Sequence, residues 1–308
     1  MIITPIKIQG KKTKLVPHII ENIDLTDNTI WVEPFLGSGE VLFNVNPNKA
    51  IVSDNNKLII DFYKKIQTKK ISSQIVREFL EEHGKKLEDI GEQYYYEMRD
   101  IFNKTHDPLY FLFLNRSCFN GMIRFNSKKE FNVPFCKKEN RFAKAYITKI
   151  VNQVKKIEDI ILSHGDNWQF ICCDWKETFN KYKNNKNAFF YFDPPYINRN
   201  SDYFNKWEEK ENNDFFNTIK NNQINFILSN WYSNKYRNND VIINNFENNQ
   251  FTIVKIDHFY HVGGKEANRN SIIECLIKNK DEWYAIHLYF FYLNILSMTY
   301  NLLLKPYI

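Results

Sequence analysis

Short apolar runs rich in β-branched and aromatic residues recur along the chain, and each predicts a buried strand. The first, Thr29–Val32, leads through the loop Gly37-Ser38-Gly39 into a helix-like stretch, and the next, Ala50–Ser53, ends at Asp54. Later in the chain come the runs WQFICCD, AFFYFDPPY, NFILSN and SIIECLIKN. Polar or helix-like segments separate these runs, and this alternation predicts a mostly parallel sheet covered by helices.

The middle of the chain has a different pattern, which interrupts this alternation. Residues 58–103 have helical periodicity, as in LIIDFYKKI and IVREFLEEH. In the stretch after them, MIRFN and EFNVPF flank Ser127-Lys128-Lys129, which predicts a β-hairpin. We therefore predict an α/β domain formed by residues 1–60 and 145–282, into which residues 61–144 insert a helical and β-hairpin region.

The last part of the chain, residues 283–308, is unusually apolar. From Trp283 to Leu304 it contains no Lys, Arg, Asp or Glu, so its length approaches that of a membrane span. Polar residues within it, among them His287 and Asn294, oppose membrane insertion. A helix or strand packed on the protein body is the favoured interpretation, and a membrane or partner-docking segment is the alternative.

Composition limits the classes of protein that remain. The 308 residues are 43% hydrophobic and 25% charged, which suits a globular protein and excludes wholesale disorder. The net charge of +6 and the 16% aromatic content are compatible with nucleic-acid binding without being specific for it. Five cysteines without a C-x-x-C pair, and histidines without ligand spacing, argue against a disulfide framework or a metal site and favour a reducing cytoplasm. The N-terminus lacks the apolar segment of a signal peptide.

The glycine loop is the first candidate for ligand binding. Gly37 and Gly39 allow a tight turn and a close approach of the backbone, and the helix starting near Glu40 offers free N–H groups. Asp54 ends the next strand, where a Rossmann-like fold places an acid on ribose hydroxyls. The full G-x-G-x-x-G pattern fails at Leu42, and no G-x-x-x-x-G-K-[ST] phosphate loop occurs. An adenosine ligand without a polyphosphate is therefore favoured over NAD or ATP, although an ordinary tight turn would give the same short motif.

The second candidate is Asp193-Pro194-Pro195-Tyr196, which follows the apolar run AFFYF. Proline lacks an N–H, so the strand must end here, at the carboxyl edge of the sheet where α/β folds bind ligands. The Asp193 carboxylate and the backbone carbonyls could accept from an amino group, and Tyr196 could stack on a flat base. A strand-to-loop turn with a core tyrosine is the alternative, which the glycine loop upstream makes less plausible.

Four sequence blocks together resemble the Dam-type, alpha-class DNA adenine-N6 methyltransferases: VEPFLGSGEVLFN, FLFLNRSCFNGMIRFNSKKEFNVPFCK, FYFDPPY and FILSNWYS. The second block is the most specific, because DPPY occurs in several groups of amino-methyltransferases. The opening IKIQGKKTKLVPHI is similar to the family's N-terminal cofactor block but lacks its tryptophan and paired glycines. The apolar tail has no counterpart in the family pattern.

The resemblance implies a Rossmann-like methyltransferase fold that depends on S-adenosylmethionine (SAM), without a metal, and with an inserted helical and β-hairpin domain that recognises duplex DNA. Asp54 would bind the ribose hydroxyls of SAM, and Asp174 would accept from its adenine amino group. Each could instead be a helix cap after a strand, and Lys12 a solvated surface charge. The cofactor residues implied by motif position are Lys12, Glu33, Pro34, Phe35, Gly37, Gly39, Asp54, Asp174 and Asp193.

The resemblance also implies that the inserted region contacts DNA. Asn120 suits an adenine edge, Arg124 suits guanine O6 and N7, and Phe119 could wedge into the space near a flipped base. The lysines would be sequence-independent phosphate contacts or merely solubilising charges. Phe119 and Met122 could equally be packed side chains, and Arg116 a brace for the hairpin. The candidate DNA-binding residues are Arg116, Phe119, Asn120, Met122, Arg124, Asn126, Lys128, Lys129 and Pro134, with Lys137 and Lys138 as further phosphate contacts.

The expected function is methyl transfer from SAM to N6 of a flipped-out adenine in a short duplex DNA site, with GATC as the expected sequence. Its catalytic residues would be Asp193, Pro194, Pro195 and Tyr196. The Asp at the head of this motif and the Dam-like hairpin argue against the alternatives, N4-cytosine or RNA methylation. A DNA-binding relative without turnover stays open, as does a companion restriction endonuclease that acts on the same site. A membrane partner is not expected.

Overall fold

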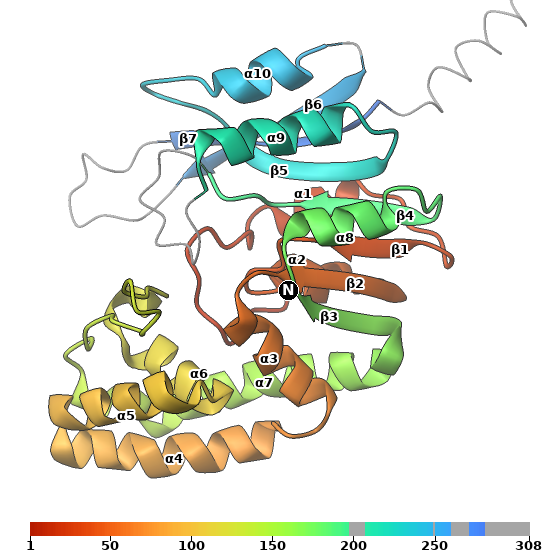
Figure 1. The fold of residues 1–308 in the computed structure, drawn as a ribbon. Helices are drawn as coiled ribbons and strands as arrows, with labels where there is room; N and C mark the ends of the chain where they lie inside the picture. Colours follow the sequence, from red (N-terminus) through yellow and green to blue (C-terminus); the bar gives the residue numbers. More distant parts are fainter. Residues whose placement is uncertain (197–206, 249, 260–270, 281–308) are drawn as a thin grey trace, which may run out of the picture.

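A computed structural model describes residues 1–196, 207–248, 250–259 and 271–280. At its centre is a seven-stranded sheet in the order β3-β2-β1-β4-β5-β7-β6 (Figure 1). The apolar tail, residues 283–308, lies outside the described residues. Among the helices described, none has the length and apolar character needed to cross a membrane. The strands are β1 (Ile30–Glu33), β2 (Lys49–Asp54), β3 (Trp168–Cys172), β4 (Ala188–Phe192), β5 (Asn225–Asn234), β6 (Phe251–Phe259) and β7 (Ser271–Asn279).

Strands β1 to β5 are parallel, and β7 runs antiparallel between β5 and β6. The mostly parallel sheet predicted from the sequence is therefore confirmed, and each predicted apolar run forms a strand. β6 is absent from the prediction. Its residues alternate, with exposed Lys255 and Asp257 on either side of buried Ile256, so a search for continuous apolar runs overlooks it.

Two hydrophobic cores lie on opposite faces of the sheet, because successive side chains of a strand point to opposite sides. Trp31 belongs to one core and Val32 to the other, and Tyr191 and Phe192 divide in the same way. Against the Trp31 face pack α1 (Val16–Glu21), α2 (Glu40–Val45), α3 (Lys57–Gln67) and α7 (Lys144–His164). Against the Val32 face pack α8 (Trp175–Tyr182), α9 (Glu209–Lys220) and α10 (Asp240–Phe246).

The inserted helices lie beyond the β3 edge of the sheet (Figure 1). They are α4 (Ser73–Ile90), α5 (Glu92–Thr105) and α6 (Pro108–Ser117), and α7 returns from them through the short turn η3 (Gly165–Asn167) to β3. Their apolar residues, such as Leu80 and Phe111, continue the core on the Trp31 face. The predicted boundary after residue 60 falls inside α3. Because one core runs through both parts, their division into a cofactor domain and a DNA-recognition domain stays a prediction.

Between α6 and α7 lies the predicted hairpin, residues 118–138, here called the hairpin loop. Its arms are joined by the antiparallel bridges Cys118–Phe135 and Phe125–Phe131. At its tip the Asn126 N–H donates to the Glu130 carbonyl at 2.9 Å. The predicted reversal of the chain is therefore present, but the arms form isolated bridges and short turns, η1 (Phe119–Gly121) before the tip and η2 (Glu139–Phe142) after the loop, in place of continuous strands.

Candidate active site

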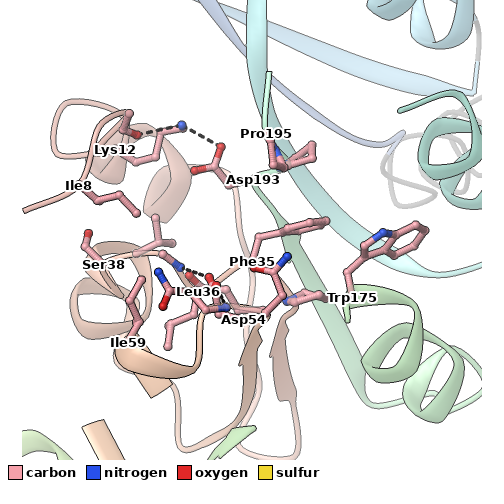
Figure 2. A pocket seen from close by; sticks show the side chains of 18 of the residues that line it. Ile8, Lys12, Phe35, Leu36, Ser38, Asp54, Ile59, Trp175, Asp193 and Pro195 are labelled. Atoms are coloured by element: carbon pink, nitrogen blue, oxygen red, sulfur yellow. Dashed lines mark hydrogen bonds and ion pairs between the residues drawn. The ribbon is translucent and has the colours of Figure 1, made fainter. Parts of the chain in front are cut away.

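A cavity opens at the carboxyl ends of β1, β2 and β4, beside the start of α8 (Figure 2). This is the edge at which open α/β sheets bind ligands. Gly39 is not part of the lining, but it lies in the turn before α2 between Ser38 and Glu40, which both line the cavity. All the other predicted cofactor and catalytic residues line the cavity: Lys12, Glu33, Pro34, Phe35, Gly37, Asp54, Asp174, Asp193, Pro194, Pro195 and Tyr196.

The glycine loop joins β1 to α2 in a conformation that requires glycine. Gly37 has φ of 51° and Gly39 has φ of 74°, in the left-handed region that other residues disfavour. A Cβ on Gly39 would lie 2.8 Å from Cε2 of Phe43, a ring that is fully buried. The Leu36 N–H donates to the Ser53 carbonyl at 2.9 Å, which ties the loop to β2.

Asp54 holds the same loop in place. Its Oδ2 accepts from the Gly37 N–H at 2.9 Å, and its Oδ1 accepts from the Asn56 N–H at 2.8 Å. Burial raises the pKa of Asp54, and these two N–H bonds oppose the rise. The cap of α3 is Asn56, which accepts from the Leu58 N–H, so the helix-cap interpretation of Asp54 is wrong. Each carboxylate oxygen keeps a further lone pair for ligand hydroxyls.

Asp174 does cap a helix, because its Oδ1 accepts from the Lys176 N–H at 2.9 Å at the start of α8. It also borders the cavity, so a cap and a ligand contact are compatible at this position. Beside it, the ring of Phe35 stacks with Trp175 at 6.2 Å between centroids, and the edge of Trp207 meets Phe35 at 5.8 Å. These rings make an apolar wall of the kind that suits a purine.

Glu33 ends β1 and is 1% exposed. Its Oε2 accepts from Nε1 of Trp31 at 2.8 Å. Burial raises the pKa of Glu33 well above its ordinary value, the Trp31 bond opposes this, and the charges of Asp193 and Asp54 raise it further. Burial therefore favours the neutral form of Glu33 when no ligand is bound.

Asp193 follows β4 and forms an ion pair with Lys12, 2.8 Å between Nζ and Oδ1. The hydroxyl of Ser229 donates to the same Oδ1 at 3.1 Å. Burial raises the pKa of Asp193, and Lys12 acts to lower it. Lys12 is 8% exposed and also donates to the Gly10 carbonyl at 3.1 Å, so the interpretation of Lys12 as a solvated surface charge is wrong. The two residues lie together above the glycine loop in Figure 2.

Tyr196 is positioned from two sides. Its hydroxyl donates to Oε2 of Glu274 on β7 at 3.2 Å, and Nζ of Lys12 lies 4.9 Å from its ring centroid. Glu274 is 1% exposed. Sequence reasoning does not single it out, although a glutamate inside the apolar run SIIECLIKN is a signal of a buried polar contact.

In the hairpin loop the candidate DNA-binding residues differ in exposure. Phe119 is 51% exposed, and its N–H donates to the carbonyl of exposed Pro134 at 2.8 Å. Asn120 is exposed with φ of 53°, and Met122 is half-buried. Arg124 is half-buried as well, and donates through Nε to Oδ1 of Asn132 at 2.9 Å and through Nη2 to its carbonyl at 3.2 Å.

The tip of this loop is polar and exposed. Oδ1 of Asn126 accepts from the N–H groups of Lys128 and Glu130, so Asn126 builds the turn. Lys128 and Lys129 lie at the turn with Lys137 and Lys138 further along, and all four side chains are exposed. Their exposure leaves them accessible to a partner of opposite charge, and phosphate contact by these lysines stays a prediction.

Arg116 is buried at the end of α6. It donates from Nη1 to the Pro5 carbonyl at 2.9 Å and from Nη2 to Oε1 of Gln153 at 3.4 Å, and its guanidinium lies 5.0 Å from the ring centroid of Tyr146. Burial lowers its pKa. These contacts bury the side chain against the N-terminal segment and α7, which favours a structural role over DNA contact, and bracing of the hairpin stays a prediction.

Comparison with known proteins decides the family. Residues 9–262 match the D12 class N6 adenine-specific DNA methyltransferase family. The chain belongs to this family. The mixed sheet with helices on both faces is accordingly the Rossmann-like fold of a D12-class methyltransferase, as the resemblance implied.

Curated relatives of this D12-class chain include type II methyltransferases and DNA adenine methylases. Type II methyltransferase M.FokI from Planomicrobium okeanokoites is 29% identical over 288 residues, which cover 90% of this chain and 42% of the relative. Type II methyltransferase M.MjaIII from Methanocaldococcus jannaschii is 29% identical over 255 residues, 74% of this chain and 84% of the relative. A DNA adenine methylase from Vibrio cholerae is 30% identical over 197 residues, 62% and 64% of the two chains. The chain thus spans less than half the length of M.FokI.

The cavity of this D12-class protein suits SAM in its chemistry. SAM combines a purine, a ribose diol, a cationic sulfur and an amino-acid zwitterion. Flat rings and the buried acceptor Asp54 are available for the first two. For a cationic ligand, the cavity offers Glu40, whose two carboxylate oxygens accept no hydrogen bond from any residue that the structure describes.

Proposed function

We propose that this protein transfers the methyl group of SAM to N6 of an adenine flipped out of a short duplex DNA site. One observation carries the proposal. The Asp193 carboxylate lines the cavity with Oδ1 bonded to Lys12 and Ser229, so Oδ2 can accept from an amino group brought to the cavity. Family membership supports adenine over cytosine as the base.

The chemistry follows from the weakness of the nucleophile. The lone pair of adenine N6 is delocalised into the ring, and SAM, when bound, supplies an electrophilic methyl group. Asp193 and the carbonyl of Pro194 would accept the two N6 hydrogens, which favours a pyramidal nitrogen with its lone pair directed at the methyl. The same acceptors would stabilise the positive charge that develops on N6. Lys12 fixes the orientation of Asp193 and favours its ionised form.

Cofactor binding would use the side of the cavity formed by the glycine loop and α8. Asp54 would accept from the ribose hydroxyls, with Gly37 and Gly39 allowing the backbone to approach. Phe35 would contact the purine ring, and Asp174 would accept from its amino group. Tyr196 would stack on the extruded adenine, held by its bond to Glu274.

DNA would be contacted by the hairpin loop. Asn120 and Phe119 are exposed there and available for a base edge and for the space left by the flipped base. Arg124 would have to exchange its bonds with Asn132 for a guanine edge. Arg116, which is bound to the Pro5 carbonyl, would have a structural role. Lys128, Lys129, Lys137 and Lys138 would face phosphates.

The finer assignments rest on the resemblance of the hairpin loop to Dam-type proteins. We propose GATC as the site, double-stranded DNA as the partner and the cytoplasm as the location. The type II relatives support a restriction–modification setting, in which an endonuclease of the same specificity acts separately on the same DNA.

Methylation sequencing of DNA from cells that express the protein tests the reaction, the base and the site together. N6-methyladenine in one short motif is expected, with GATC the first motif to examine, and none is expected in cells expressing Asp193→Ala. The variant should still bind SAM, because Asp54 and the glycine loop are intact. Expressed wild-type protein that binds SAM and leaves adenine unmodified would contradict the proposal. Nucleoside analysis of the same DNA would then test for N4-methylcytosine.

A further inference from the structure

Glu40 is the acidic residue of the cavity whose carboxylate has no hydrogen-bond partner among the described residues. It is the first residue of α2 and is 3% exposed, yet neither of its carboxylate oxygens accepts a hydrogen bond from the described part of the chain. The neighbouring acids are satisfied, Glu33 by Trp31 and Asp54 by two backbone N–H groups. A buried carboxylate without donors is costly, so a ligand that brings donors would gain free energy there.

Lys11 lines the same cavity and is bound to Oγ1 of Thr4 at 3.1 Å. Burial lowers the pKa of Lys11, and the negative charge of Glu40 acts in the opposite direction, so the two groups lie within electrostatic reach. The lining of the cavity therefore includes an anion and a cation within electrostatic reach of each other. An α-amino acid in its zwitterionic form carries the complementary pair of charges.

The position of Glu40 indicates which cationic group of SAM it would bind, the sulfonium or the α-ammonium. The sulfonium must face Asp193 and Tyr196 for methyl transfer. Ser38, two residues before Glu40, lies with Ile8 and Ile59 on the opposite side of the cavity from Pro195 and Trp175 (Figure 2). A sulfonium also has no hydrogen to donate, whereas an ammonium has three N–H donors for the two free oxygens.

We propose that Glu40 binds the α-ammonium of the methionyl group of SAM, with Lys11 facing the carboxylate of the same group. This inference rests on the proposed function. It identifies Glu40 as a residue that would recognise the amino-acid end of the cofactor. Glu40 would be a binding residue, and its contribution would not depend on the charge at sulfur.

Calorimetric titration of the full-length protein with three ligands tests the assignment. The ligands are SAM, S-adenosylhomocysteine, which lacks the charge on sulfur, and the analogue of S-adenosylhomocysteine in which hydrogen replaces the amino group. Glu40→Gln should bind the first two about 10- to 100-fold more weakly than wild type, since the neutral amide loses the ion pair with the ammonium and has one acceptor oxygen in place of two. Its affinity for the deaminated analogue should equal that of wild type.

Lys11→Met provides the matched comparison, because it should weaken all three ligands, including the deaminated one that keeps its carboxylate. An effect of Glu40→Gln confined to SAM would mean pairing with sulfur and overturn the inference, as would an equal loss for all three ligands or no loss at all. Wild-type protein that binds none of them would overturn the proposed function and the inference with it. Wild-type binding with unchanged affinity in Glu40→Gln would overturn the inference alone.

Discussion

An ion pair with Lys12 favours the ionised form of Asp193, the group that would accept the N6 hydrogens. Burial raises the pKa of Asp193, and Lys12, 2.8 Å away, lowers it. Replacing Lys12 with Met should therefore raise this pKa further. If transfer requires the ionised carboxylate, activity falls as pH falls through this pKa, so the acid limb of the activity profile should move to higher pH by about 1 unit or more.

The measurement is the initial rate of methyl transfer against pH at saturating SAM and DNA. Lys14→Met is the control, because Lys14 is an exposed lysine in the same segment. Its profile should match that of wild type. An acid limb in Lys12→Met that stays in place while the rate drops at every pH would mean that Lys12 acts on orientation alone.

Glu33 gives a second prediction, on stability. Its pKa in the folded protein is raised well above the ordinary value by burial, so the protonated form is the one that the fold stabilises. That contribution is complete below the ordinary pKa of about 4.3 and is lost as pH rises through the raised pKa. Glu33→Gln imitates the neutral acid and can still accept from Trp31. Its free energy of unfolding should exceed that of wild type at pH 8 by about 1 kcal/mol or more, and match it at about pH 3.5, below the ordinary pKa.

Urea unfolding at the two pH values measures this difference in the absence of SAM. Glu81→Gln, at an exposed position on α4, should change stability by less than about 0.5 kcal/mol at either pH. An equal effect of Glu33→Gln at both pH values would show that the change comes from packing and not from ionisation.

At the scale of elements, the turn from β1 to α2 depends on glycine for two separate reasons. Gly39 has φ of 74°, and a Cβ there would meet the buried ring of Phe43 at 2.8 Å. Gly165 has φ of 52° at the end of α7, where a Cβ would meet nothing within 4 Å. Gly165→Ala should therefore show a backbone cost alone, about 1–3 kcal/mol, because its ψ of −126° lies in a region that other residues rarely adopt. Gly39→Ala should add an overpacking cost of about 1–3 kcal/mol.

Denaturant unfolding of the two variants compares their losses in the free energy of unfolding. SAM titration then shows which variant also loses affinity for the cofactor. Gly39→Ala should lose SAM affinity because Phe43 or the loop must move, whereas Gly165→Ala should retain it. Equal stability losses and equal SAM affinities in the two variants would show that the loop accommodates the methyl group.

The sequence was sufficient for elements whose signal is local. Continuous apolar runs marked the strands on either side of the glycine loop and before Asp193, because a parallel strand buried on both faces is apolar throughout. Continuous apolar runs do not predict β6, because its exposed residues alternate with buried ones. The reversal of the chain at the hairpin loop is predicted correctly, but the residue pattern does not show that its arms are joined by isolated bridges in place of continuous strands.

Residue roles set by distant contacts lay beyond the sequence pattern. Glu274 meets Tyr196 across 78 positions, and Arg116 meets Pro5 across 111. The periodicity of apolar residues does not predict such pairs. The motif Asp193-Pro194-Pro195-Tyr196 therefore identifies Tyr196 but not its partner Glu274. The resemblance likewise grouped Arg116 with its exposed neighbours although the side chain is buried.

At the scale of the whole molecule, the net charge of +6 is small, so DNA affinity would depend on where the lysines lie. Lys128 and Lys129 project from the tip of the hairpin loop, whereas Lys85 and Lys86 are exposed on α4, in the inserted helices beyond the β3 edge (Figure 1). Each lysine that neutralises a phosphate releases condensed counterions, which makes binding weaken as salt rises. The two pairs carry the same charge. Replacing each pair in turn therefore distinguishes a local contact with DNA from an effect of the net charge.

Replacing Lys128 and Lys129 with Gln should reduce the slope of log affinity against log salt by about 0.9 for each phosphate that is no longer neutralised. The affinity should fall similarly for specific and unrelated duplexes, because phosphate contacts are independent of sequence. The pair Lys85→Gln and Lys86→Gln should leave the slope unchanged. Fluorescence anisotropy across a salt series measures both. Equal reductions in the two pairs would mean that net charge, not the hairpin loop, governs the encounter with DNA, and the loop would then lose its place as the DNA-facing surface.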